Sequence, residues 1–391
     1  MSMRRIVVVG NGIAGQTACD SLRSAGFDGE LTIIGAESHR PYSRPALSKA
    51  LLHDADGLGS HALPEPDHGA NEILGIGATG LDIEAGRVLL EQGESVPYDG
   101  LVIASGSRAR RLSEGRESGA GGRELTLRTL EDAIALRQAI ASRPSVVVVG
   151  GGPLGLEVAS GAVHAGCDVT LVSEAPPLTR QLGGHLADIF TQAAVRRGLR
   201  IVRGGKARLA ESGTRVVLED GTDVEGDLLV TAIGDEPNVH WLARTNLLRH
   251  GALQVDSRGR LAPEIVAAGD VAFFPTGRGV MRVPLWTSAI DQAKVAARGL
   301  IQGEGAAEFD FQPYFWTEAF GLSLKSVGFT PVPGWPDHLE PGKDPDSRLM
   351  YWEHADGSGT AASINYRIPV PKLRRLANAG PAALRPAASA V

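Results

Sequence analysis

Two glycine-rich segments have the residue types and spacing for binding chemistry. Residues 10–15 read Gly-Asn-Gly-Ile-Ala-Gly after the apolar run 6–9, and residues 150–155 read Gly-Gly-Gly-Pro-Leu-Gly after the apolar run 146–149. Such a segment turns tightly out of a buried strand, lets a pyrophosphate approach the backbone and directs a helix N-terminus at its charge. The positions that we expect to contact a cofactor are Gly10, Gly12, Ala14 and Gly15 in the first loop and Gly150, Gly152, Leu154 and Gly155 in the second.

The residues after the two loops repeat the same plan, which matters because one such motif alone is a weak signal. Each loop precedes a helix that ends at a glycine, and then a buried strand followed by a glutamate. The helices are expected at 13–22 and 154–165, and the strands at 31–34 and 169–172. Glu37 and Glu174 then stand where the hydroxyls of a ribose need an acceptor. The sequence predicts two bound nucleotides; the alternative is that only one of the two units binds one.

The composition bounds the class of protein. A chain of 391 residues with a net charge of −6 is expected to be globular, with two or three domains and no nucleic acid partner. No apolar run approaches the roughly 20 residues of a spanning helix, so we expect no membrane insertion. Cys19 and Cys167 form no C-x-x-C pair. We therefore expect buried thiols in a reducing cytoplasm, no redox dithiol and no metal site.

The segments outside the two units complete a predicted α/β fold. A small antiparallel β excursion is expected over 73–98, and a strand over 101–107 ends in small residues. Thr129 and Asp132 form a capping signal for a helix that ends before Pro144. Later segments expected to be regular are a strand within 227–234, a strand over 265–272, and a helix over 289–300 after Trp286. From residue 311 the chain reads as strands followed by a basic helix at 372–379, which predicts a C-terminal α+β domain.

Several further segments resemble one family. They are Arg-Pro-Tyr-Ser-Arg-Pro-Ala-Leu-Ser-Lys at 40–49, Leu-Arg-Thr-Leu-Glu-Asp at 127–132, Gly-Gly-Pro-Leu-Gly-Leu-Glu at 151–157, Ala-Ala-Gly-Asp at 267–270 and Tyr-Phe-Trp at 314–316. In this order the chain resembles flavin-dependent NAD(P)H oxidoreductases with two Rossmann-like, glutathione-reductase-like domains. Within them it resembles the ferredoxin reductases of bacterial oxygenase systems, of the putidaredoxin reductase and rubredoxin reductase type.

The resemblance implies where the cofactors bind. FAD would occupy the first loop, in a discontinuous domain of residues 1–112 and 235–312. NADH, with NADPH as the alternative, would bind in a domain of residues 113–234, and residues 313–391 would form the third domain. The flavin would lie between Lys49 and the segment 269–270. Further cofactor-binding positions implied in this way are Glu37, Arg44, Lys49, Ala78, Arg128, Asp270, Trp286, Trp316, Glu174 and Gly234.

The choice between NADH and NADPH rests on the residues after strand 169–172. Family members often carry an acid where this chain has Ser173, and Glu174 is the next residue. A carboxylate there accepts ribose hydroxyls and repels a phosphate, which favours NADH. The one-residue shift and the nearby Arg180 leave NADPH open.

The resemblance also implies a catalytic pair. In the family the residues matching Lys49 and Glu157 form an ion pair beside the reactive edge of the flavin. Our hypothesis is that this pair positions the nicotinamide and tunes the flavin, rather than acting as acid and base. The alternative for Glu157 is an acid that only complements the helix dipole.

The missing thiols indicate where the electrons go. Relatives that reduce disulfides or peroxides carry cysteine after the first ribose acid, whereas residues 41–45 here read Pro-Tyr-Ser-Arg-Pro. The expected function is hydride transfer from NADH to FAD, then single electrons to a [2Fe-2S] ferredoxin, or a rubredoxin, that feeds an oxygenase. Trp316 matches a family tryptophan near the carrier's docking face. The alternative is a slowly turning over signalling flavoprotein of the apoptosis-inducing-factor type. Either would be a monomer or a homodimer.

Overall fold

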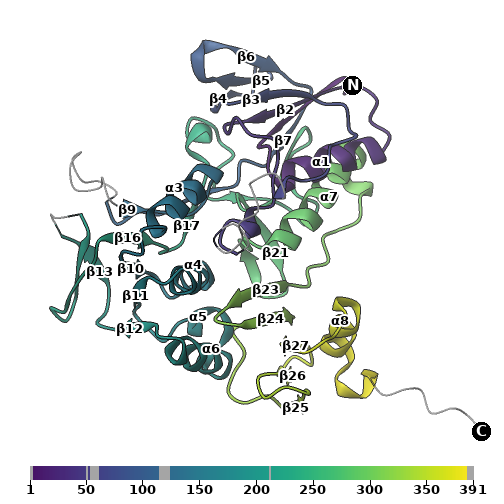
Figure 1. The fold of residues 1–391 in the computed structure, drawn as a ribbon. Coiled ribbons are helices and arrows are strands. Elements are labelled where there is room, and N and C mark those ends of the chain that lie inside the picture. Colours follow the sequence, from purple (N-terminus) through teal and green to yellow (C-terminus); the bar gives the residue numbers. More distant parts are fainter. Residues whose placement is uncertain (1–2, 50–51, 53–60, 114–123, 211–212, 385–391) are drawn as a thin grey trace, which may run out of the picture. The chain divides into compact units, whose positions relative to one another are not determined.

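The computed structural model describes residues 3–49, 52, 61–113, 124–210 and 213–384, and its ribbon is drawn in Figure 1. Within those residues no helix is both long enough and apolar enough to cross a membrane. The chain divides into two compact units. The first contains the described residues within 1–43, 58–108 and 236–311, and the second those within 44–57, 109–235 and 312–391. The predicted three-domain division stays a prediction.

A six-stranded sheet forms the centre of the first unit. Its strand order is β19-β20-β7-β1-β2-β3, and all neighbours except β19 and β20 run parallel. The strands are β1 (Arg5–Val9), β2 (Glu30–Gly35), β3 (Asn71–Leu74), β7 (Gly100–Ile103), β19 (Arg260–Ala262) and β20 (Ile265–Ala267). A central parallel strand is buried on both faces, which is why β1 is continuously apolar.

Alternate residues of β1 enter two different cores. Ile6 and Val8 pack with the helices α1 (Ile13–Ser24) and α7 (Trp286–Gln302), which lie side by side in Figure 1. Val7 and Val9 face the opposite core, shared with the smaller sheets β4-β5-β6 and β18-β21-β22. These strands are β4 (Ala78–Asp82), β5 (Arg87–Leu90), β6 (Ser95–Pro97), β18 (Leu253–Gln254), β21 (Ala272–Thr276) and β22 (Gly279–Met281). The period of two in side-chain direction produces this division.

The second unit repeats the plan with a five-stranded parallel sheet in the order β12-β11-β10-β16-β9. Its strands are β9 (Glu124–Leu125), β10 (Ser145–Val149), β11 (Asp168–Val172), β12 (Arg200–Val202) and β16 (Leu228–Thr231). Its helices are α3 (Leu130–Ile140), α4 (Pro153–His164), α5 (Thr179–Leu182) and α6 (Gly184–Arg196). A meander of β13 (Ala207–Leu209), β14 (Arg215–Leu218) and β15 (Asp223–Glu225) packs on Val147 and Val149. Strands β8 (Ser107–Ala109) and β17 (Asp235–Pro237) pair with each other.

The C-terminal part of the second unit is an antiparallel sheet with one helix. The strand order is β23-β24-β27-β26-β25, and α8 (Val370–Ala379) packs on β27. The strands are β23 (Tyr314–Ala319), β24 (Leu322–Val327), β25 (His338–Pro341), β26 (Arg348–Glu353) and β27 (Gly359–Ile364). Leu373, Leu376 and Ala377 form the apolar face of α8 that fills the core.

Three expected elements differ in detail. The residues from Ile73 do not open the antiparallel excursion, because β3 pairs in parallel with β2 and only β4 to β6 are antiparallel. The strand expected over 265–272 is divided into β20 and β21, because Gly269 turns with φ of 81°. Helix α7 begins at Trp286 rather than 289, with Leu285 as its N-cap residue just after a proline. Residues 107–123 are rich in Gly, Ser and Arg, which predicts a crossing between domains, and they lie partly outside the described residues.

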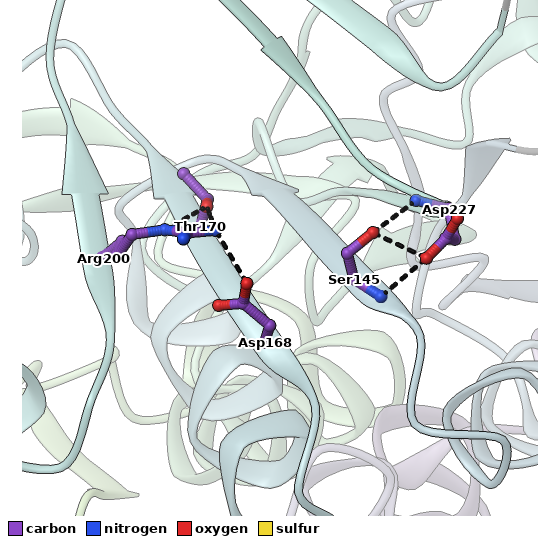
Figure 2. A network of polar contacts seen from close by, with 5 residues as sticks. All are labelled: Ser145, Asp168, Thr170, Arg200 and Asp227. Atoms are coloured by element: carbon purple, nitrogen blue, oxygen red, sulfur yellow. Dashed lines mark hydrogen bonds and ion pairs between the residues drawn. The ribbon is translucent and has the colours of Figure 1, made fainter.

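In each unit an aspartate binds the start of the strand that precedes the glycine loop, β1 or β10. The carboxylate of Asp99 accepts the backbone N–H groups of Arg4 and Arg5, both at 2.9 Å, and the Arg5 guanidinium at 2.8 Å. In the second unit Asp227 accepts the backbone N–H of Ser145 at 2.9 Å and its hydroxyl at 2.7 Å, as Figure 2 shows. Both aspartates therefore fix the start of the strand that leads into a glycine loop.

The neighbouring strand start in the second unit carries a further polar contact. Arg200 on β12 reaches Asp168 at 3.1 Å and donates its Nε–H to Thr170 Oγ1 at 3.2 Å (Figure 2). The side chains of Arg200 and Asp168 are largely exposed, so their ion pair contributes little to stability. It follows the register in which Thr170 of β11 pairs with Arg200.

The Asp99 contact predicts a pH-dependent contribution to stability. The Arg5 guanidinium and the backbone N–H groups lower the pKa of Asp99 to about 2. A lowered folded-state pKa stabilises the fold above the unfolded pKa of about 3.9, and this contribution is lost as the pH falls towards about 2. We expect Asp99→Asn to lower the free energy of unfolding at pH 7 by about 1 kcal/mol or less, because solvent screens the pair. Urea unfolding at pH 7, 4 and 2.5 measures this. The difference in the free energy of unfolding between wild type and variant should become smaller as the pH falls. A difference that stays constant would contradict the lowered pKa of Asp99.

Candidate functional site

Glycine is required in the first loop for two different structural reasons. A Cβ at Gly10 would lie 2.0 Å from the carbonyl oxygen of Ala104, and one at Gly15 would lie 1.8 Å from the carbonyl oxygen of Gly10. The chain's own packing therefore excludes a side chain at both. At Gly12 a Cβ would meet nothing within 4 Å. The open space at Gly12 is where a ligand can approach the backbone.

The second loop has the same geometry. A Cβ at Gly150 would lie 2.2 Å from the carbonyl oxygen of Ala232, and one at Gly155 would lie 1.9 Å from that of Gly150. At Gly152 the nearest atom is the amide nitrogen of Gln181, at 3.7 Å. Gly12 and Gly152 are the N-cap residues of α1 and α4, and neither cap makes a side-chain hydrogen bond. Both helices thus present backbone N–H groups that suit a phosphate.

The two predicted ribose acids lie at different offsets from their sheets. Val9 pairs with Ile34 and Val149 pairs with Val172. Glu37 is the third residue after Ile34, whereas Glu174 is the second after Val172. Glu37 accepts a hydrogen bond from the Tyr42 hydroxyl at 2.5 Å. Glu174 forms an ion pair with Arg180, whose side chain is 70% exposed. Each acid thus stands just past the β-strand that follows its glycine loop and helix.

The structure brings Lys49 and Glu157 together inside the second unit. Lys49 Nζ lies 2.9 Å from Glu157 Oε1 and 3.0 Å from Oε2. The Glu157 side chain is 5% exposed and that of Lys49 is 17% exposed. Glu157 lies in the first turns of α4, next to Leu156, which packs in the core. A buried carboxylate of this kind is stable only when donors surround it.

Two hydroxyl groups that the sequence did not indicate complete the surroundings of Glu157. Thr317 on β23 donates to Oε1 at 2.6 Å, and Ser48 donates to Oε2. Thr317 is fully buried and Ser48 is 5% exposed. The available signal was adjacency, because Ser48 precedes Lys49 and Thr317 follows Trp316 in the segments that carry the family resemblance. Nothing local shows that both side chains turn towards the same carboxylate.

Aromatic residues adjoin this cluster. Lys49 Nζ lies 5.9 Å from the ring centroid of Trp316, within the range of a cation–π interaction. Trp316 stacks on Tyr314 with ring centroids 5.8 Å apart. Alternate residues of β23 thus carry these two rings on one face, while Thr317 points to the other and reaches Glu157.

The remaining predicted residues are distributed over both units. Arg44 and Arg128 meet in the second unit, where Arg44 Nη1 donates to the Arg128 carbonyl oxygen at 2.8 Å. Asp270 follows the Gly269 turn, whose backbone N–H binds the buried side chain of Gln292 at 2.9 Å. The other positions are Ala78 at the start of β4, Trp286 at the start of α7, Ala14 and Leu154 in the first turns of α1 and α4, and Gly234 after β16 with φ of 107°.

The two cysteines are buried and separate. Cys19 lies in α1 of the first unit and Cys167 follows α4 in the second. Burial raises the pKa of the Cys19 thiol to about 12 and also raises that of Cys167. Neither thiol is therefore ionised near neutral pH. Redox chemistry of cysteine requires the ionised thiolate.

Comparison with known proteins places this geometry in a family. The model of the pyridine nucleotide-disulphide oxidoreductases matches residues 4–296. The ferredoxin–NAD(+) reductase component of the p-cumate 2,3-dioxygenase system of Pseudomonas putida is 34% identical over 83% of this chain and 81% of its own. The corresponding component of the anthranilate 1,2-dioxygenase system of Burkholderia cepacia is 33% identical over 97% of this chain and 95% of its own.

A solved structure agrees over nearly the whole chain. The covalent complex of putidaredoxin reductase with putidaredoxin contains a chain with a TM-score of 0.81 and 27% identity, covering 93% of this chain and 90% of that one. The fold class and the family resemblance expected from the sequence are confirmed. The chain belongs to the pyridine nucleotide-disulphide oxidoreductase family, and relatives that match most of its length are ferredoxin–NAD(+) reductase components of oxygenase systems.

Proposed function

We propose that this protein is the reductase component of an oxygenase system. When bound, FAD supplies a group that accepts a hydride from NADH and passes electrons on one at a time to a [2Fe-2S] ferredoxin. The observation that carries the proposal is the combination of this family's fold with two buried, separate cysteines. Because the chain offers no thiol pair to relay electrons to a disulfide, the acceptor is a separate carrier.

The first glycine loop supports FAD as the group held by the first unit. The open face of Gly12, the tight packing at Gly10 and Gly15, and the uncapped start of α1 suit a pyrophosphate. Glu37 would accept the ribose hydroxyls. Asp270, just after a glycine turn fixed by Gln292, would accept a ribityl hydroxyl of FAD.

The second loop supports a nicotinamide dinucleotide, and Lys49 with Glu157 would position its ring. Two hydroxyl groups and one ammonium group donate to the two oxygens of Glu157. Lys49 Nζ in turn contacts both of these oxygens and lies 3.4 Å from the Pro45 carbonyl oxygen. Groups whose donors and acceptors are already used are suited to hold a geometry rather than to transfer a proton.

Steady-state kinetics with a panel of carriers tests the proposed function. NADH and NADPH are each offered with several [2Fe-2S] ferredoxins, several rubredoxins and ferricyanide as a small acceptor. The proposal predicts turnover with NADH and at least one ferredoxin that exceeds turnover with every rubredoxin. Slow turnover with every acceptor, together with a long-lived reduced flavin, would contradict it and favour a signalling flavoprotein.

The contact between Glu174 and Arg180 makes the preference for NADH testable. Glu174 holds the Arg180 guanidinium, which would otherwise suit the 2′-phosphate of NADPH. We expect Glu174→Ala to lower kcat/KM for NADH and raise it for NADPH, shifting the ratio by about tenfold or more, since one charged contact is lost and one is freed. The matched control is Glu174→Ala combined with Arg180→Ala, which should lose the gain with NADPH. An unchanged ratio in the single variant would show that these residues do not set the donor.

A further inference from the structure

A buried chain of hydrogen bonds leads from residue 68 to the first glycine loop. The side chains of His68 and Gln16 are 4% and 6% exposed. His68 Nε2 lies 3.0 Å from Gln16 Oε1, and Gln16 Nε2 lies 2.5 Å from Asn11 Oδ1. Asn11 is the residue between Gly10 and Gly12. All of these residues belong to the first unit.

The direction of this relay follows from one backbone group. The backbone N–H of Ala70 donates to His68 Nδ1 at 3.1 Å, so Nδ1 carries no proton. A neutral imidazole then has its proton on Nε2, and burial, which lowers the pKa of His68, favours the neutral form. His68 Nε2 therefore donates, which requires the oxygen of the Gln16 amide to face it. The Gln16 side-chain nitrogen then donates to Asn11, which requires the oxygen of the Asn11 amide to face Gln16.

The relay of hydrogen bonds from His68 through Gln16 to Asn11 ends at the NH₂ group of Asn11. Asn11 Nδ2 is buried and has no hydrogen-bond partner among the residues that the structure describes. It lies beside the end of β2, because a Cβ built at Gly35 would be 3.6 Å from Nδ2 and 2.8 Å from Asn11 Cβ. Glu37 is the second residue after Gly35. A buried amide donor without a partner is costly, and an acceptor atom of a bound ligand would remove that cost.

We propose that the Asn11 side chain donates a hydrogen bond to an oxygen of the adenosine diphosphate half of FAD, and that Gln16 and His68 orient it for this. The inference rests on the proposed function, because it takes FAD as the ligand of the first loop. The second loop contains no equivalent group. Gly151 occupies the position of Asn11 there, and a Cβ on it would lie 2.8 Å from Ser173 Cβ. The relay therefore distinguishes the FAD loop from the nicotinamide loop.

Two variants test the relay through the affinity of the apoprotein for FAD, measured by the quenching of FAD fluorescence. Asn11→Ala removes the donor and should raise the Kd by about three- to tenfold, the value of one hydrogen bond. Gln16→Glu does not remove Asn11. The carboxylate introduced at position 16 still accepts a hydrogen bond from His68. It can accept one from Asn11 only if the Asn11 amide flips, so that its NH₂ group faces position 16 and its oxygen faces FAD. We therefore expect a loss of about tenfold from a residue that does not touch the ligand.

The controls separate this effect from charge and from folding. Gln302→Glu makes the same chemical change at an exposed position at the end of α7 and should leave the Kd within twofold of the wild type. In the double variant Asn11→Ala, Gln16→Glu, the second substitution should not raise the Kd for FAD further, because the Asn11 side chain that Gln16 orients is already absent. Circular dichroism of each apoprotein checks that it is folded.

The outcomes are distinguishable from those of the proposed function. A wild type that binds FAD, with Asn11→Ala and Gln16→Glu both within twofold of its Kd, overturns the inference alone. If the two increases in the Kd for FAD multiply in the double variant, the inference is also overturned. A wild-type apoprotein that binds no FAD overturns the proposed function and this inference with it.

Discussion

The carboxylate of Glu157 is the constraint on which the site in the second unit depends. A buried charge must be surrounded by donors, and these donors come from segments that are far apart in the sequence. Ser48 and Lys49 reach it from 108 or more residues away, and Thr317 from 160 residues away. The backbone N–H of Phe320 also donates to Ser160 on the same helix, at 2.8 Å. Helix α4, the segment 44–49 and strand β23 therefore hold one another in place.

We propose that the same βαβ plan serves two nucleotides, and small differences distinguish the two loops. The chain's own packing excludes side chains at Gly10 and Gly15 and at the matching Gly150 and Gly155, whereas Gly12 and Gly152 are open. The strand that precedes each loop, β1 or β10, is bound at its start by an aspartate, Asp99 or Asp227. The loops differ at Asn11 against Gly151, and in the offset of the acid that follows the second strand. The proposed discrimination between FAD and a nicotinamide donor therefore lies in a few side chains on a repeated backbone.

Local patterns predicted most of the fold, but they did not predict the pair at the centre of the site. The period of apolar residues gave β1, α1 and their repeats, and Thr129 with Asp132 forms the expected capping box. Family resemblance, rather than any local pattern, indicated that Lys49 and Glu157 meet. Ser48 and Thr317 could not be identified, because their roles depend on tertiary contacts between remote segments. The Gln16–His68 contact was hidden for the same reason, since residue 68 lies in a stretch without regular structure.

The central claim is that Lys49 and Glu157 act as one positioning unit during reduction of the flavin by NADH. Stopped-flow measurement of that reduction in the wild type, Lys49→Met, Glu157→Gln and the double variant tests it directly. Groups that act together have non-additive effects. The account predicts that each single variant keeps FAD but reduces it about tenfold or more slowly, and that the double variant is no slower than the slower single one. Single variants that react at the wild-type rate, or losses that multiply in the double variant, would contradict it.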